Sequence, residues 1–304
     1  MWAVLFALFA AMSNALATVL QRIGVEESAP SGPRSSGKLM ASVITRRVWI
    51  VGLLFATASF LLQALALALG DLSRVQPVMV TEIVFLMAVL GFWFRRPLGW
   101  AEWSGAIATA VGLGVFLYVS SPTGGGVRPD LGSWAMVLGA AVGGLVLSLA
   151  MTRFRSRSWR AAWFGAAGGI CFALTAATLK VSSDYVARQG IGHLFFHWQP
   201  YVVAASGLVG LVIVQHSLQA GSIAASQSVL LIVNPVASIL IGTQLFGDRL
   251  QTAGGREAVD ALALTVMFVG LFILAHSPLV SSPDAEEHLS RGRPERLDVD
   301  RVPS

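Results

Sequence analysis

Few residues in this sequence could do chemistry, and they lie within long apolar stretches. Glu82 is the only acidic residue well inside such a stretch. A charge near the centre of a bilayer costs on the order of 3 kcal/mol, so an ionisable residue there is a candidate functional site. We therefore predict that Glu82 is a proton- or cation-coupling carboxylate facing a central cavity. The alternative is a neutral carboxylic acid hydrogen-bonded to a neighbouring helix.

Two prolines lie in comparable apolar stretches. Pro77 precedes Glu82, and Pro235 follows Asn234. Proline has no backbone N–H, so it interrupts the hydrogen-bond ladder of a helix and frees a carbonyl. At membrane depth a free carbonyl is tolerated beside a protein partner or a cavity, where it can coordinate a cation or a substrate. The prolines and Asn234 are therefore candidate pathway residues. A kink without a function is the alternative.

Uncharged amides complete the candidate set, because each offers a donor and an acceptor without carrying charge. The alternative role for them is hydrogen bonding between helices, worth about 0.6 kcal/mol per contact. These residues are Asn14, Gln63, Gln76, Gln215 and Gln227.

The sequence lacks the common catalytic motifs. It has no Gly-rich phosphate loop followed by Lys, no His-Glu-x-x-His and no nucleophile elbow. His193 and His197 are four residues apart, but a Gly-containing loop favours an exposed turn over a metal site. The single cysteine, Cys171, excludes a disulfide within the chain. We expect no enzyme activity, no cofactor, no metal site and no nucleic-acid partner.

Composition indicates a membrane protein. The chain is 55% hydrophobic and 12% charged, whereas soluble domains carry about 25% charged residues. A spanning helix needs about 20 apolar residues. We predict an all-α integral membrane protein with nine transmembrane helices, and expect Lys180, at the end of the sixth, to extend to the outer interface. The predicted spans are 1–21, 48–70, 75–94, 101–120, 132–152, 160–180, 199–216, 222–246 and 259–277.

Basic residues predict the orientation. Counting alternate connections, 15 Lys and Arg fall on the side of the C-terminus and 6 on the other. Positive residues concentrate in the cytoplasm. We therefore place the N-terminus outside, the C-terminus in the cytoplasm, and the chain in the cell membrane. Residues 1–280 form the transmembrane domain, and the polar composition of 281–304 predicts a disordered cytoplasmic tail.

The two halves of the chain resemble each other. Residues 70–91 align with 221–242 at an offset of 151, which places Gln76 on Gln227. Residues 114–122 align with 270–278, and 15–22 align more weakly with 173–180. Repeat one (1–120) and repeat two (160–277) therefore pair helices 1–4 with helices 6–9, and helix 5 (132–152) is a linker. Partners are five crossings apart, so the repeats are inverted, which is typical of alternating-access carriers.

The layout resembles the drug/metabolite transporter (EamA-like) superfamily, which is built from two inverted helical repeats. Members have a proline in the helix that here is the third of each repeat and an acidic residue at its end. Asp248 fits the second half, whereas Arg95-Arg96-Pro97 departs from the pattern in the first. The nine-helix form is similar to the NIPA magnesium-transporter-like branch. The motifs that carry the resemblance are Gln21-Arg22-Ile23-Gly24, Val75-Gln76-Pro77, Gly112-Leu113-Gly114, Lys180, Asn234-Pro235, Phe246-Gly247-Asp248 and Val269-Gly270.

These features favour a secondary transporter that moves a metabolite or drug-like molecule by alternating access. A divalent-cation (magnesium) transporter is the alternative, although a single carboxylate provides few oxygen ligands for that ion. A structural or interaction protein of the membrane is a further alternative. The expected partners are a small-molecule or ion substrate and the lipid bilayer, and a homodimer is left open. Gly139-xxx-Gly143 and Gly165-xxx-Gly169 predict close helix packing.

Overall fold

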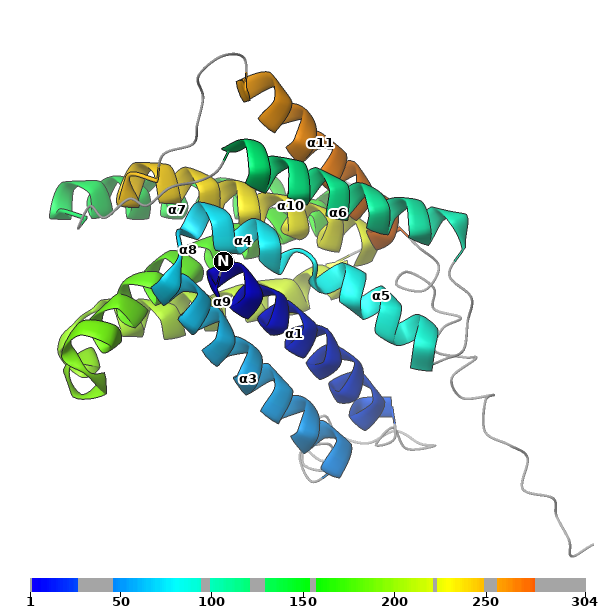
Figure 1. The fold of residues 1–304 in the computed structure, drawn as a ribbon, viewed down its shortest axis with the longest axis horizontal. Coiled ribbons are helices and arrows are strands. Elements are labelled where there is room, and N and C mark those ends of the chain that lie inside the picture. The colour runs from blue at the N-terminus through cyan, green and yellow to red at the C-terminus, as the bar shows by residue number, and fades with distance from the viewer. Residues whose placement is uncertain are drawn as a thin grey trace, which may run out of the picture.

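The computed structural model describes residues 2–26, 46–93, 99–120, 129–153, 157–220, 223–248 and 256–276. Within these ranges the chain is helical, with no β-strand (Figure 1). Eight helical segments of the described chain are long and apolar enough to cross a membrane. The chain therefore has the helices of a multi-pass membrane protein. The predicted tail 281–304 lies outside the described residues.

The helices follow one another along the chain. Their bounds are α1 Trp2–Glu26, α3 Arg47–Leu69, α4 Leu72–Met79, α5 Glu82–Trp93, α6 Trp100–Ser120, α7 Leu131–Met151, α8 Arg157–Gln189, η1 Ile191–Phe196, α9 Gln199–Ala220, α10 Ile223–Ile241, η2 Gly242–Phe246 and α11 Arg256–Ala275.

Most predicted spans coincide with a helix to within a few residues. Two differ in form. The predicted span 75–94 is divided into α4 and α5, and the predicted helix 160–180 continues to Gln189, giving α8 33 residues. At 1.5 Å per residue α8 is about 50 Å long, more than the roughly 30 Å of a bilayer core. The count of nine spans stays a prediction, because the apolar part of α9, Gln199–Val214, is shorter than the other eight.

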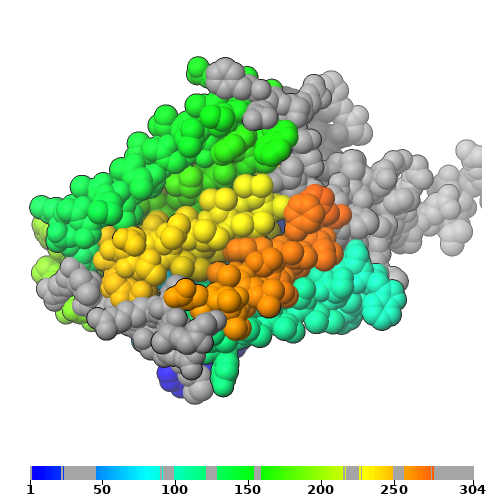
Figure 2. Space-filling model, turned by 90° about the horizontal axis from the view of Figure 1, so that it is seen from above, coloured from blue at the N-terminus to red at the C-terminus, as the bar shows by residue number. Residues whose placement is uncertain are grey.

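The bundle is assembled from helix pairs. α1 packs along α3, α8 packs along both α9 and α10, and α6 packs along α11 (Figure 1). Figure 2 shows one face, on which α10 and η2 lie between α7 on one side and α11 with α6 on the other. The largest buried cluster draws its side chains from both halves of the chain and therefore joins them; the contributing elements are α1, α3, α4, α5, α6, α7, α8, η2 and α11.

Glycines bring the helix backbones together at two of these pairs. On α6, a Cβ on Gly112 would lie 2.5 Å from the Met267 nitrogen and 2.6 Å from the Ala263 carbonyl oxygen of α11. On α8, a Cβ on Gly165 would collide with the Ser226 carbonyl oxygen of α10. No side chain larger than hydrogen fits without moving a backbone.

The predicted close packing holds for one glycine pair and fails for the other. Gly165 and Gly169 of α8 both face α10, and a Cβ on Gly169 would lie 3.0 Å from the Val233 side chain. A Cβ added to Gly139 or Gly143 of α7 would meet nothing within 4 Å. The same spacing therefore marks a helix contact on α8 and an open face on α7.

The close contact of α6 with α11 predicts a selective loss of stability. We expect Gly112→Ala to lower the free energy of unfolding by about 1–3 kcal/mol, because the added methyl forces two helices apart. Gly114→Ala is the matched control, since a Cβ at Gly114 of the same helix meets nothing within 4 Å. The two melting temperatures, measured in one detergent, check this. Equal melting temperatures would contradict the packing.

Candidate functional site

The break between α4 and α5 positions the site. α4 ends two residues after Pro77, and α5 starts at Glu82. Across the break the backbone hydrogen bonds change to the 3₁₀ pattern, in which each N–H donates to the carbonyl three residues before it. Val80 N donates to Pro77 O at 3.3 Å, and Thr81 N donates to Val78 O at 3.0 Å. The Thr81 hydroxyl donates to the same Val78 carbonyl at 2.8 Å. The predicted helix break is therefore found three residues after Pro77 rather than at it, and it puts Glu82 in the first turn of a new helix.

Glu82 has a partner from another helix. The Asn14 side chain of α1 lies within hydrogen-bonding reach of the Glu82 carboxyl, and α1 packs along both α4 and α5. Both side chains are partly buried among the helices. An amide can donate to a carboxylate or to a carboxylic acid, so Asn14 can hold Glu82 in either protonation state. Two of the predicted pathway residues are thus brought together.

The pair lies near the middle of its spans. Glu82 is ten residues after Leu72, the first residue of its span, or about 15 Å along a helix. Asn14 is twelve residues after Trp2, where α1 begins, or about 18 Å. Both distances are close to half of a roughly 30 Å hydrocarbon core. Both residues therefore lie in the central part of their apolar helical segments.

Gln76 is buried one turn before the break. It is 2% exposed, and its amide nitrogen has no hydrogen-bond partner among the described residues. A buried donor without a partner costs about 1–3 kcal/mol relative to a satisfied one. This nitrogen is therefore available to a group that enters between the helices.

The other candidates are less well defined. α10 continues as a helix through Pro235 and changes only at Gly242, where the π-type turn η2 begins, so the break predicted at Asn234-Pro235 is displaced. Asn234 is partly buried, and its side-chain oxygen accepts from Ser238 at a long 3.5 Å. Gln63 is partly exposed on α3. The side chains of Gln215 and Gln227 lie outside the described residues.

Lys180 requires a correction. It does not extend to an interface, because it is 7% exposed and its Nζ donates to Leu67 O at 3.0 Å and Gly70 O at 2.8 Å. The error came from placing the helix end at Lys180, whereas α8 continues for nine more residues to Gln189. Lys180 therefore lies about two and a half helix turns before the end of α8, where backbone carbonyls of α3 and its C-cap are closer to the ammonium than water is.

Sequence reasoning also missed two buried acids near helix starts. Glu102 of α6 and Asp260 of α11 are 6% and 8% exposed, and Asp260 keeps one carboxylate oxygen without a partner within the described part of the chain. Their position in the first turns of predicted spans was the available signal. Among the described residues, no three His, Cys, Asp or Glu side chains are grouped to hold a metal ion.

Two acids outside the spans show how burial and hydrogen bonding act in opposite directions. Burial raises the pKa of Asp248, which follows η2, although hydrogen bonds from Ser73 and the charge of Lys180 oppose that shift. Hydrogen bonds from Ser133 lower the pKa of the exposed Asp130, which caps α7. Asp130 is therefore a surface helix cap, whereas Asp248 is a buried group.

Comparison with known proteins finds one uncharacterized relative. The chain is 28% identical over 278 residues to an uncharacterized protein of Corynebacterium glutamicum, covering 90% of this chain and 95% of the relative. No family model matches the chain, and no solved structure gives a significant match. The alignment covers nearly the whole length of both proteins, and it assigns no activity to either.

The Asn14–Glu82 contact predicts a measurable coupling between α1 and α5. We expect Asn14→Leu and Glu82→Leu to be non-additive, with a coupling energy of about 0.6–1.7 kcal/mol, the range found for hydrogen bonds between membrane helices. A double-mutant cycle in a detergent unfolding assay measures it. Asn14→Leu with Gln63→Leu is the control cycle. Additive effects in both cycles would show that the two side chains do not interact.

Proposed function

We propose that this chain is a secondary transporter of the drug/metabolite type, which moves a small solute across the cell membrane by alternating access. The observation that carries the proposal is the Asn14–Glu82 pair. An ionisable group near mid-bilayer is costly and persists where it serves a pathway or a relay. Carriers built from repeats bind their cargo at this depth, beside interrupted helices.

The helix pairing supports the repeat that the sequence predicts. In repeat one, α1 packs along α3 and contacts α4 and α5. In repeat two, α8 packs along α9 and α10 in the same order. The last helices of the two halves, α6 and α11, pack on each other, as expected for elements next to a pseudo-twofold axis. This pattern is consistent with an inverted repeat and a central site.

The proposed site is asymmetric between the repeats. At the sequence offsets of 151 and 158, the equivalents of Glu82 and Asn14 are Val233 and Phe172. The carboxyl–amide pair therefore exists once, in repeat one. One titratable group at the centre suits proton coupling, because a proton needs a single acceptor that can be reached alternately from either side.

A proteoliposome assay tests the transport function. We expect uptake of a small solute driven by a pH gradient, and loss of that coupling in Glu82→Gln, because the amide keeps the shape and hydrogen bonding of the carboxyl but cannot titrate. Glu257→Gln is the matched control, since Glu257 is an exposed carboxylate at the start of α11. The assay includes Mg²⁺ as a test solute, to distinguish the divalent-cation alternative. If solute uptake by Glu82→Gln had the same pH dependence as the unchanged protein, Glu82 would not be the coupling group.

Reporter fusions test the proposed orientation. We expect a reporter after Ser304 to be cytoplasmic and one before Met1 to be external, because nine spans put the termini on opposite sides and the basic residues gather on the C-terminal side. Alkaline phosphatase and a fluorescent protein, each active on one side of the membrane, make the measurement. Both termini on the same side would mean an even number of spans.

A further inference from the structure

Lys180 of α8 closes the end of a helix in the other half of the chain. We call the end of the bundle where α1 begins the amino end. There α3 ends at Leu69, and Gly70-Asp71 turns the chain into α4. The last carbonyls of a helix have no partner within it, and the Lys180 ammonium binds two in this region, Leu67 O and Gly70 O. A positive charge at a helix C-terminus is also favoured by the helix dipole.

Asp248 closes the start of α4 from the same side. Its Oδ2 accepts a hydrogen bond from Ser73 N at 3.0 Å, at the second residue of α4. Asp248 is 4% exposed. Its position depends on the end of η2, where Gly247 has φ 67° and Asp248 N donates to Gly242 O at 3.1 Å. A Cβ on Gly242 would lie 2.5 Å from Asp248 Oδ2, so the glycine lets the carboxylate reach α4.

The local residues that normally cap these ends do not do so. Asp71 occupies the N-cap position of α4 with extended backbone angles, but its side chain makes no cap hydrogen bond. Asp is among the best N-cap residues. Gly70 at the end of α3 is extended, rather than in the left-handed conformation that closes many helices. Both helix ends are therefore capped by the other half of the chain.

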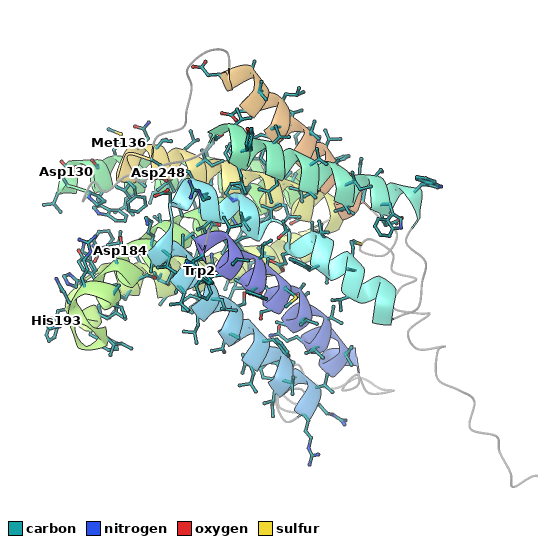
Figure 3. The ribbon with its side chains drawn as sticks, viewed as in Figure 1. Trp2, Asp130, Met136, Asp184, His193 and Asp248 are labelled. Atoms are coloured by element: carbon teal, nitrogen blue, oxygen red, sulfur yellow. The ribbon has the colours of Figure 1, made fainter. Side chains whose placement is uncertain are left out.

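The contacts form one cluster between the halves. The Lys180 ammonium lies 5.6 Å from the centre of the Phe246 ring, two residues before Asp248. The charged groups that act on the Asp248 carboxylate are Lys180 and Asp71. The charges of Lys180 and Arg188 act on the Asp184 carboxyl of the same helix, α8. Figure 3 places Asp184, Asp248 and Trp2 toward the amino end.

The amino end is closed beneath this cluster. Leu67, Leu72, Val75 and Phe246 are each at most 2% exposed and belong to the main buried cluster. The α3–α4 corner also packs on α1, because a Cβ on Gly70 would lie 2.5 Å from the Ala3 Cβ. No side of Gln76, one turn further in, is open to solvent.

We propose that Lys180 and Asp248 form a gate at the amino end, which joins the α3–α4 corner to α8 and η2 and parts when the central site opens to that side. The proposal rests on the transport function. A gate needs hydrogen bonds that water can replace. The helix-end carbonyl and N–H groups that Lys180 and Asp248 bind lie near the membrane surface and meet that condition, whereas the Asn14–Glu82 pair at mid-depth does not meet it. Every bond of the gate crosses between the halves, so parting them leaves each half's helices intact.

Cysteine labelling tests the gate without a substrate. Cys171 is replaced by Ser, and Gln76→Cys reports on the space below the gate. A membrane-impermeant maleimide is added to proteoliposomes whose amino end faces outward. The companion variant Ile191→Cys identifies that orientation, because Ile191 of η1 is 71% exposed beyond the end of α8. We expect slow labelling of Gln76→Cys in this background, because the side chain is buried behind the closed end.

The gate variants should raise the labelling rate. We expect Lys180→Met and Asp248→Asn each to increase it about tenfold, because the rate follows the population of the open state. Asp184→Asn is the matched control, because it removes a charge near Lys180. The Asp184 side chain makes no bond to the α3–α4 corner, so the labelling rate should not change. If Lys180→Met does not fold, Asp248→Asn and Lys180→Arg carry the test. Arg keeps the charge, and its changed geometry should give a smaller increase.

The outcomes separate the gate from the transport function. Unchanged labelling in Asp248→Asn and in the folded Lys180 variant would overturn the gate and leave two stabilising helix caps. Faster labelling in all variants, including Asp184→Asn, would also overturn it, because the effect would then be general loosening. Faster labelling confined to the gate variants supports the gate even if no solute is transported. Transport without a labelling change would retain the carrier and reject the gate.

Discussion

The structure depends on one constraint, which is that hydrocarbon offers no hydrogen bonds. Every backbone N–H and C=O within a span must find its partner inside the protein. Helices satisfy this requirement residue by residue, and hydroxyl side chains follow the same rule. The hydroxyls of Thr109, Thr178 and Ser182 each donate to the carbonyl four residues before them, at 2.8 Å. Polar residues of this kind are accommodated within their own helix and add no link between helices.

The groups that cannot be satisfied locally are therefore the informative ones. A proline leaves a carbonyl without its usual donor, a helix end leaves several, and a long polar side chain can reach past its own helix. In this chain such groups occur at two levels. Near mid-depth the break after Pro77 is followed by the Asn14–Glu82 pair. At the amino end, Lys180 and Asp248 serve the α3–α4 corner. Elsewhere in the described part of the bundle, small and apolar residues provide most of the packing, with further polar links such as the Ser59 hydroxyl of α3 donating to Ala10 O of α1 at 2.8 Å.

The distinction between groups satisfied within their own helix and groups that need another helix also decides which features could be predicted from the sequence. Hydropathy placed α6 and α7 to within one residue, because burial in lipid is a property of each segment alone. A break was predicted at Pro77 from its missing N–H, whereas the observed break begins after Met79. The role of Lys180 was not predicted, because it depends on where the ends of α3 and α4 lie in space. Likewise, Gly143 and Gly165 share the same spacing pattern, and only the assembled bundle decides which glycine meets another helix.

The asymmetry of the central site follows from what repeats can and cannot share. An inverted repeat needs similar backbones in its two halves, so that each half can adopt the conformation of the other. It does not need similar chemistry, because both conformations act on one site. In the proposed carrier, Val233 occupies the position equivalent to Glu82, and it packs against Gly169 of α8. A second carboxylate there would be packed against α8 in a medium of low dielectric constant, where burial would favour its protonated form. A single acid therefore gives the site one protonation event for each cycle, while the apolar partner position provides a close helix contact against which the polar half can move.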